Sequence, residues 1–196
     1  MTPLEVAANV ALVISILLAA RNSVHTWWTG IVACGLFALL FERSQLYADV
    51  VLQLFFVATS AWGWWLWLVG QGGEALPVGR SSPRMLLGLA VVGALVTLIY
   101  GALLHRFTNA YAPFADSAVL AFSVIAQCLM MKRKLACWPV WLLVNSIAVP
   151  LYFSRGLTLT AGLYVLFWFN AFHGWHRWRQ DLLRADVALP AAGQRA

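Results

Sequence analysis

Seven long apolar runs constrain this chain more than any other feature. They cover Leu4–Ala20, Trp27–Phe41, Tyr47–Val69, Met85–Leu104, Phe114–Met131, Trp138–Phe153 and Leu157–Trp175. A helix needs about 20 apolar residues to cross a bilayer, and several of these runs approach or exceed that length. Only 10% of the 196 residues are charged, whereas a soluble domain has roughly a quarter of its residues charged. The sequence therefore predicts an all-α integral membrane protein with seven transmembrane helices.

The distribution of Lys and Arg predicts the orientation in the membrane. The side that holds the N-terminus has Arg43, Arg106 and Arg155. The other side has Arg21, Arg80, Arg84, Lys132, Arg133, Lys134, Arg177, Arg179, Arg184 and Arg195. Because cytoplasmic loops are enriched in Lys and Arg, we expect the N-terminus outside and the C-terminus in the cytoplasm. The same rule explains the net charge of +6 without a nucleic-acid partner.

An internal repeat relates the two halves of the chain at an offset of 111 positions. The stretch Gln53–Trp67, QLFFVATSAWGWWLW, aligns with Tyr164–Trp178, YVLFWFNAFHGWHRW, and keeps Phe, Gly and two Trp in register. About a dozen identical pairs fall over roughly 65 aligned residues without a gap, as expected for a duplicated unit. Three spans, a linker span and three more spans give a 3+1+3 plan. Since an odd number of spans separates equivalent helices, the repeats are predicted to be parallel, with a substrate bound between them.

The repeat divides the chain into four parts. Residues 1–69 form the first three-helix repeat, and residues 70–106 hold a loop rich in Gly, Pro and Ser followed by the linker helix. Residues 107–179 form the second repeat. The cytoplasmic tail, residues 180–196, is expected to be disordered at its end.

The candidate substrate-binding residues are uncharged polar and aromatic side chains within the spans. Five of them lie at steps of 3, 4, 4 and 3 on one helix face: Gln53, Phe56, Ser60, Trp64 and Trp67. The others are Gln127, Trp141, Asn145, Tyr164, Asn170 and Trp175. Such a set suits a flat, polar or cationic ring. Hydrogen bonds between helices, and lipid-facing aromatic belts for about half of the Trp residues, are the structural alternatives. The clusters Trp27–Trp28, Trp62–Trp67 and Trp175–Trp178 lie near span ends, where such belts occur.

Asn145 is the polar residue nearest the middle of its span, where an unpaired amide is costly. Its repeat equivalent is Cys34, so only one repeat holds this amide. The three cysteines form no metal pattern and are interpreted as small apolar residues. Gly63 and Gly174 are expected to permit close helix approach. These glycines, or a kink at Pro150, are candidate hinges.

Three segments resemble the PnuC family of bacterial vitamin transporters. They are LYADVVLQLFFVATSAWGWWLW (46–67), FTNAYAPFADSAVLAFSVIAQ (107–127) and WPVWLLVNSIAVPLYFSRGLTLTAGLYVLF (138–167). The likeness runs over roughly residues 4–178, and the order of the motifs is fairly specific. It implies a fold similar to the SWEET sugar transporters, a homotrimer, and a place in the bacterial inner membrane. It also implies facilitated diffusion of nicotinamide riboside, trapped afterwards by cytoplasmic phosphorylation.

Some positions depart from the family pattern. The family has an Asn where this chain has Ala33, another near Ser60 and a third where His173 stands. The resemblance implies that Gln53, the Trp residues after Gly63 and Asn145 face the substrate. The changed polar contacts leave the substrate open among nicotinamide riboside, thiamine and riboflavin.

The leading hypothesis is passive transport of a nucleoside-like vitamin, with nicotinamide riboside as first choice, by rocking of the two repeats. A heptahelical sensor that binds a ligand without passing it is the alternative from another class, although the chain lacks a signalling domain. A membrane enzyme is third, because the sequence has no Walker A, G-x-S-x-G or H-E-x-x-H motif. His173 and His176 have no third ligand in sight. We therefore expect a substrate and membrane lipid as partners, and neither a metal nor another cofactor.

Overall fold

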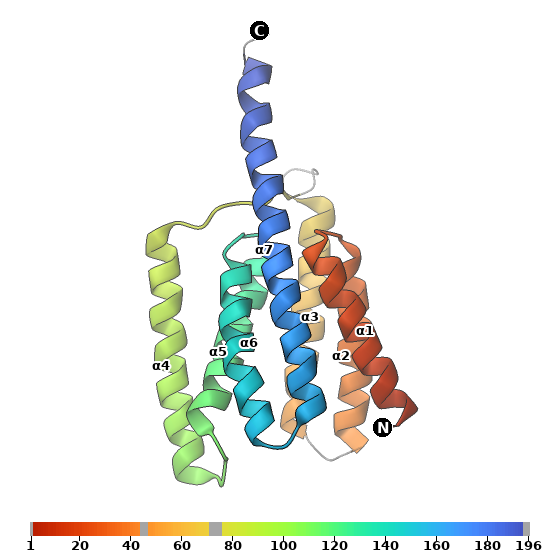
Figure 1. Ribbon diagram of the computed structural model, residues 1–196, viewed down its shortest axis with the longest axis vertical. Helices are drawn as coiled ribbons and strands as arrows, with labels where there is room; N and C mark the ends of the chain where they lie inside the picture. Colours follow the sequence, from red (N-terminus) through yellow and green to blue (C-terminus); the bar gives the residue numbers. More distant parts are fainter. Residues whose placement is uncertain (1, 44–46, 71–75, 194–196) are drawn as a thin grey trace. The chain divides into compact units, whose positions relative to one another are not determined.

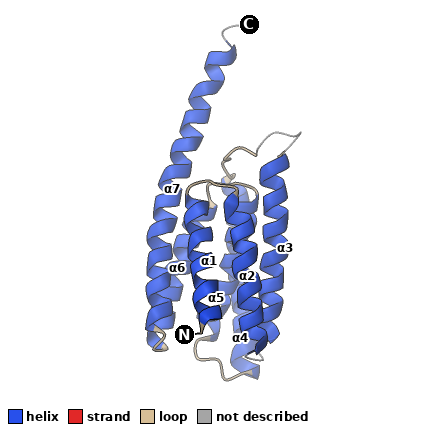
Figure 2. Ribbon diagram, turned by 90° about the vertical axis from the view of Figure 1, so that its right-hand side faces the viewer, coloured by secondary structure: helices blue, strands red, loops and turns tan. Residues whose placement is uncertain are grey.

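The computed structural model describes residues 2–43, 47–70 and 76–193. Within these ranges the chain forms seven helices joined by short loops (Figures 1 and 2). They are α1 (Pro3–Ala20), α2 (His25–Arg43), α3 (Tyr47–Val69), α4 (Pro83–Phe107), α5 (Pro113–Met131), α6 (Cys137–Ser154) and α7 (Thr158–Gly193). The first six agree with the predicted spans within three residues at either end.

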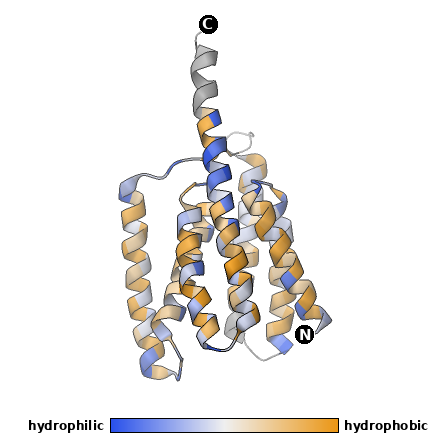
Figure 3. Ribbon diagram, in the orientation of Figure 1, coloured by the Kyte–Doolittle hydropathy of each residue, from blue (hydrophilic) through white to orange (hydrophobic). Residues whose placement is uncertain are grey.

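Five stretches of this helical chain are long and apolar enough to cross a membrane. They are Pro3–Ala20, Leu52–Val69, Pro83–Phe107, Pro113–Met131 and Cys137–Ser154. Figure 3 shows the hydrophobic colour along these helices and the hydrophilic colour near the middle of α7. The remaining helices, α2 and α7, carry more polar residues, so composition alone does not identify them as spans.

The last helix continues beyond the predicted span Leu157–Trp175. Helix α7 has 36 residues and continues to Gly193. The segment QDLLRADV that follows Arg179 is rich in good helix formers, and extending an existing helix avoids the cost of nucleation. Asp181 and Arg184 also form an i,i+3 pair with 3.9 Å between the carboxylate oxygen and the guanidinium nitrogen. Residues 194–196, where disorder was predicted, lie outside the described residues.

The chain folds into two compact units. Unit 1 contains α1, α2 and α3 together with Met131–Arg133, the short segment at the end of α5. Unit 2 contains α4, the rest of α5, α6 and α7. The predicted boundaries at residues 69, 106 and 179 follow the sequence repeat and stay predictions.

In unit 1, α2 lies between two neighbours, because it contacts both α1 and α3. The α2–α3 contact is very close at Gly63, where an added Cβ would lie 2.6 Å from the Trp27 ring. Trp27 also meets Trp67 edge-on, with ring centroids 5.3 Å apart and an interplanar angle of 86°. Between α1 and α2, Ser15 Oγ donates to the carbonyl of Thr26 at 2.8 Å and Thr26 Oγ1 donates to the carbonyl of Ser15 at 2.9 Å. Glycine thus permits the close approach that the sequence predicted.

Unit 2 repeats the aromatic part of this arrangement between α6 and α7. An added Cβ on Gly174 would lie 2.5 Å from the Trp138 ring. Trp138 and Trp178 meet edge-on at 5.3 Å and 89°. At the far end of α6, Arg155 forms a 2.6 Å ion pair with Asp116 of α5.

The offset of 111 found in the sequence also holds for the backbone of each unit. Helices α2 and α6 end at equivalent residues, and α3 and α7 begin at equivalent residues. In the turns that precede α2 and α6, Ser23 N–H donates to the Leu18 carbonyl at 3.0 Å and Lys134 N–H donates to the Leu129 carbonyl at 2.9 Å. Equivalent residues in these two turns have positive φ, namely Asn22 at 57° and Arg133 at 50°. The two turns therefore share one backbone geometry with different side chains.

Candidate functional site

The most distinctive polar feature of unit 2 is one face of α6. Trp138, Trp141 and Asn145 lie at steps of 3 and 4, which places them on the same side of the helix. Asn145 is buried, with 4% of its surface exposed. The indole nitrogens of Trp138 and Trp141 are buried and have no hydrogen-bond partner among the described residues. We call these three residues the α6 polar face.

Buried polar groups without partners are rare in proteins and costly. An indole N–H only donates a hydrogen bond, whereas an amide both donates and accepts. The α6 polar face therefore offers two donors and one mixed group, none of them charged. It suits the carbonyl and hydroxyl oxygens of a polar ligand whose ring lies against the aromatic side chains.

Unit 1 has a different set of side chains at the equivalent positions. Trp27 keeps the place of Trp138, and its indole nitrogen is also buried without a partner among the described residues. Gly30 replaces Trp141, and an added Cβ there would lie 3.2 Å from Ser15 Oγ and 3.8 Å from Ser60 Oγ. Cys34 replaces Asn145. The two repeats thus share a tryptophan but differ at the positions of Trp141 and Asn145. Such a difference suits a ligand that is itself asymmetric.

The five candidates on α3 lie in different surroundings. Ser60 and Trp67 are buried, Gln53 and Phe56 are half-buried, and Trp64 is 37% exposed. Trp67 donates its indole N–H to the Met131 carbonyl at 3.2 Å, and its ring lies 4.4 Å below the Arg133 guanidinium. Trp67 is therefore already engaged by the protein, and its predicted substrate contact stays a prediction.

The remaining candidates lie on α5 and α7. Asn170 is 7% exposed, and Gln127 is half-buried. Both have interactions with the protein. Tyr164 lies against Tyr152 of α6 at a centroid distance of 5.0 Å. Trp175 lines a surface depression of α7. The structure gathers Trp141 and Asn145 on one face and leaves the roles of these other candidates as predictions.

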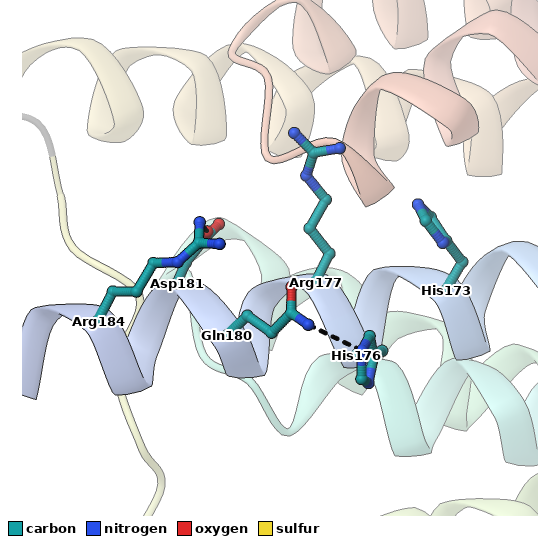
Figure 4. A pocket seen from close by; sticks show the side chains of 6 residues that line it. All are labelled: His173, His176, Arg177, Gln180, Asp181 and Arg184. Carbon is teal, nitrogen blue, oxygen red and sulfur yellow. Dashed lines mark hydrogen bonds and ion pairs between the residues drawn. The ribbon is translucent and has the colours of Figure 1, made fainter.

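A second depression lies further along α7, in the part drawn in Figure 4. Its lining residues are His173, His176, Arg177, Gln180, Asp181 and Arg184. The His176 ring and the Gln180 amide share a 2.9 Å hydrogen bond, drawn as a dashed line. Among the described residues there is no cluster of three or more His, Cys, Asp or Glu that would hold a metal ion. None of the predicted substrate residues lines this depression.

Two tryptophans beside the candidate site, Trp138 and Trp27, were not among the predicted site residues. The sequence placed Trp138 in the repeat and in the segment 138–167 that resembles the family, and it placed Trp27 in a belt near a span end, but both are only 2% exposed. The burial of both tryptophans could have been inferred from their equivalence at offset 111. Gly63 and Gly174, the glycines that they contact, are equivalent at the same offset, and a lipid-facing Trp would not need such a pairing. The belt interpretation is wrong for Trp67 and Trp178 too, because both are buried. Trp62 and Trp65 are about 60% exposed, as a belt requires.

These features define a polytopic helical membrane protein with a buried, uncharged polar face inside one helical unit. A model of the nicotinamide mononucleotide transporter family matches residues 2–180, and the chain belongs to this family. The family comprises PnuC-type vitamin transporters, in agreement with the resemblance seen in the sequence. The protein is a membrane transporter.

Two curated relatives cover most of the chain. The nicotinamide riboside transporter PnuC of Escherichia coli (strain K12) is 26% identical over 202 residues, which cover 89% of this chain and 84% of that protein. The riboflavin/roseoflavin transporter RibM of Streptomyces davaonensis is 24% identical over 201 residues, which cover 95% and 91%. The crystal structure of the vitamin B3 transporter PnuC matches with a TM-score of 0.71 at 22% identity, over 92% of this chain and 82% of that chain. The last comparison establishes the shared fold.

Proposed function

We propose that this protein takes up nicotinamide riboside by facilitated diffusion. The substrate binds between two parallel three-helix repeats arranged 3+1+3, and rocking of the repeats alternates access to it. Membership of the family and the nicotinamide riboside transporter of E. coli support this substrate. The equivalence of helix bounds and turns at offset 111 supports the repeat.

The α6 polar face is the observation on which the proposal depends. The indole nitrogens of Trp138 and Trp141 are buried without a partner among the described residues, beside the buried Asn145. An unpaired buried donor is expensive unless a ligand or water completes its hydrogen bonds. A carboxamide and a ribose present oxygens that match the two indole donors and the amide. The aromatic rings beside them suit the electron-poor pyridinium ring.

The neutrality of α6 supports passive transport. This helix holds no Asp, Glu, Lys, Arg or His from Cys137 to Ser154, whereas ion-coupled pumps place ionisable groups inside the membrane. A passive carrier only equilibrates its substrate, so net uptake requires a further step. In this proposal a cytoplasmic kinase phosphorylates the vitamin and traps it.

The proposed setting is the bacterial inner membrane, with the N-terminus outside and the C-terminus in the cytoplasm. The ten Lys and Arg residues on one side against three on the other support this orientation. A homotrimer is the proposed assembly, and the family resemblance is its support. The same resemblance supports the roles proposed for Gln53 and Trp64 in substrate contact.

Riboflavin is the second candidate substrate. The likeness to RibM extends over 91% of that protein at nearly the same identity as the likeness to PnuC. The substitution of Asn by Ala33 and His173, relative to the family pattern, fits a changed substrate. Thiamine stays a third possibility from the sequence alone.

Binding and flux measurements test the proposal. Quenching of tryptophan fluorescence is measured with nicotinamide riboside, riboflavin and thiamine, and uptake of the labelled vitamin into empty liposomes follows. We expect saturable quenching and flux with nicotinamide riboside. Quenching by riboflavin alone would support riboflavin as the substrate. Binding without flux would favour a ligand-binding sensor over a transporter.

Asn145→Ala tests the site itself. If the Asn145 amide serves the substrate and not the fold, the variant is expected to keep an unfolding temperature close to that of the parent. Loss of its hydrogen bonds to the substrate is expected to weaken binding by roughly 10-fold. Ser146→Ala is the matched control for binding, because Ser146 is exposed on another face of α6 and its hydroxyl bonds Leu142 and Trp168, which lie outside the α6 polar face. Normal binding by the Asn145 variant means that the site is misplaced.

A further inference from the structure

One side of α7 carries a row of aromatic side chains that ends in an arginine. Trp168, Phe172, Trp175 and Arg179 lie at steps of 4, 3 and 4, so they share one side of the helix. The Trp168 and Phe172 rings stack with their centroids 6.3 Å apart and an interplanar angle of 5°. Phe172 meets Trp175 edge-on at 6.3 Å and 82°. Phe172 and Arg179 are exposed, and the two tryptophans are half-buried. We call these four residues the α7 stripe.

The end of the α7 stripe forms a depression with an aromatic and basic lining. Its lining residues are Phe172, Trp175, His176 and Arg179. The His176 ring shares its 2.9 Å hydrogen bond with Gln180, one turn further along the helix (Figure 4). His176 also borders the second depression of α7, but that one contains Asp181, which pairs with Arg184. The first depression is the better place for an anion, because its described lining holds a guanidinium and no carboxylate.

The sequence around the end of the stripe is basic. From 173 to 184 it reads HGWHRWRQDLLR, with three Arg and two His against a single Asp. In the proposed topology the span Leu157–Trp175 ends at the cytoplasmic interface, so His176 and Arg179 lie at the level of the lipid headgroups. The cytoplasmic leaflet contains anionic lipids, which attract basic segments next to the membrane. Charge and position therefore both favour an anionic lipid headgroup.

The repeat supplies an internal comparison for this depression. At the offset of 111, Phe172, His176 and Arg179 correspond to Ala61, Trp65 and Leu68 of α3. Trp65 is 57% exposed and Leu68 is 56% exposed. The equivalent place on α3 thus presents apolar side chains, which suit acyl chains. On α7 the same place presents an imidazole and a guanidinium, which suit a phosphate.

We propose that the α7 stripe binds one anionic phospholipid of the cytoplasmic leaflet. The Arg179 guanidinium binds the phosphate through parallel hydrogen bonds, with His176 beside it. One acyl chain lies along Trp168 and Phe172. Trp175 then contacts the glycerol region, in place of the substrate contact predicted from the sequence. The proposal rests on the proposed crossing of the membrane by α7, and it adds a lipid partner that transport itself does not require.

Native mass spectrometry of the full chain in a neutral detergent counts bound lipids directly. The protein is titrated with palmitoyl-oleoyl phosphatidylglycerol, with phosphatidylcholine of the same chains, and with inorganic phosphate. We expect one phosphatidylglycerol per chain, bound at least about fivefold more tightly than phosphatidylcholine, because the choline cation cancels the phosphate charge. Equal affinity for the two lipids overturns the proposal. Inorganic phosphate that binds as tightly as phosphatidylglycerol overturns it too, because the acyl chain then contributes nothing.

Arg179→Gln is the main variant, and Arg84→Gln is its matched control. Arg84 is exposed near the beginning of α4, on the same predicted side of the membrane, so both variants lose one positive charge. We expect Arg179→Gln to bind phosphatidylglycerol about fivefold more weakly and Arg84→Gln to bind it like the parent. Unchanged binding by Arg179→Gln overturns the proposal. Equal losses in both variants also overturn it, because they indicate a diffuse attraction and not a site.

Phe172→Ala is the second variant, for use if Arg179→Gln does not fold. Phe172 is 54% exposed, and its loss removes contacts with the acyl chain. We expect both lipids to bind about fivefold more weakly, with the preference for phosphatidylglycerol retained; unchanged binding of both lipids overturns the proposal. The titration needs no substrate. A failure of nicotinamide riboside to bind or to cross the membrane therefore counts against the proposed function alone.

Discussion

Gly174→Ala tests the closest helix contact in unit 2. The new methyl group would lie 2.5 and 2.6 Å from two ring carbons of Trp138, well inside van der Waals contact. Trp138 is 2% exposed and meets Trp178 edge-on, so its ring has little room to move. Overpacking of this kind costs about 1–3 kcal/mol.

Gly162→Ala on the same helix is the control that isolates this cost. An added Cβ there meets nothing within 4 Å in the described structure. Both substitutions gain the same helix propensity, about 0.8–1 kcal/mol, so the gain cancels in the comparison. The two variants are therefore expected to differ by the overpacking cost alone.

The assay is thermal unfolding in detergent, followed by intrinsic fluorescence. For a chain of this length 1 kcal/mol corresponds to about 2–4 °C, so we expect Gly174→Ala to unfold roughly 2–12 °C below Gly162→Ala. The displaced Trp138 belongs to the α6 polar face, so substrate binding is expected to weaken in the first variant alone. If the two unfolding temperatures coincide, the Trp138 ring is free to move and the packing argument is refuted.

Three further predictions concern single contacts. Ser15→Ala is expected to destabilise unit 1 by about 0.5–1.5 kcal/mol, because it removes the buried hydrogen bond from Ser15 Oγ to the Thr26 carbonyl, which still accepts from Thr29 Oγ1; denaturant titration measures this, and an unchanged midpoint contradicts it. Asp116→Asn removes the partly exposed ion pair with Arg155, so the expected loss is at most about 1 kcal/mol. That loss is expected to shrink as salt is raised, and a salt-independent loss would argue against an ionic origin. Trp67→Phe keeps a ring below the guanidinium but deletes one hydrogen bond, so a loss of about 0.5–1.5 kcal/mol is expected in thermal unfolding; a drop in substrate affinity at unchanged stability would instead restore Trp67 to the binding site.

The sequence predicted the helices well because each apolar run ends at a clear signal. The span Tyr47–Val69 agrees at both ends with α3, since Glu42 and Arg43 precede it and a Gly-rich loop follows. The prediction of close approach at Gly63 and Gly174 is also confirmed. Both results depend on local composition and on the repeat, which a single sequence contains in full.

The candidate site was harder to predict because hydrogen-bond partners depend on packing. Trp67 and Trp141 look equally suitable in the sequence, yet the Trp67 indole bonds a backbone carbonyl 64 residues away and the Trp141 indole has no partner among the described residues. No helical period distinguishes these two situations. The extension of α7 beyond residue 179 was missed for another reason, because a polar composition argues against burial but not against helix.

Helix α7 is long enough that a small tilt would displace its C-terminal end by a measurable distance. Its 36 residues span about 54 Å at 1.5 Å per residue, whereas the apolar core of a bilayer is about 30 Å thick. In the proposed arrangement, in which α7 crosses the bilayer, roughly 24 Å of helix is left to project from the lipid. A tilt of about 10° within the membrane would swing the end of that projection by several ångströms. A spin or fluorescent label at exposed Arg184 would turn a small movement of the helix into a distance that spectroscopy measures easily.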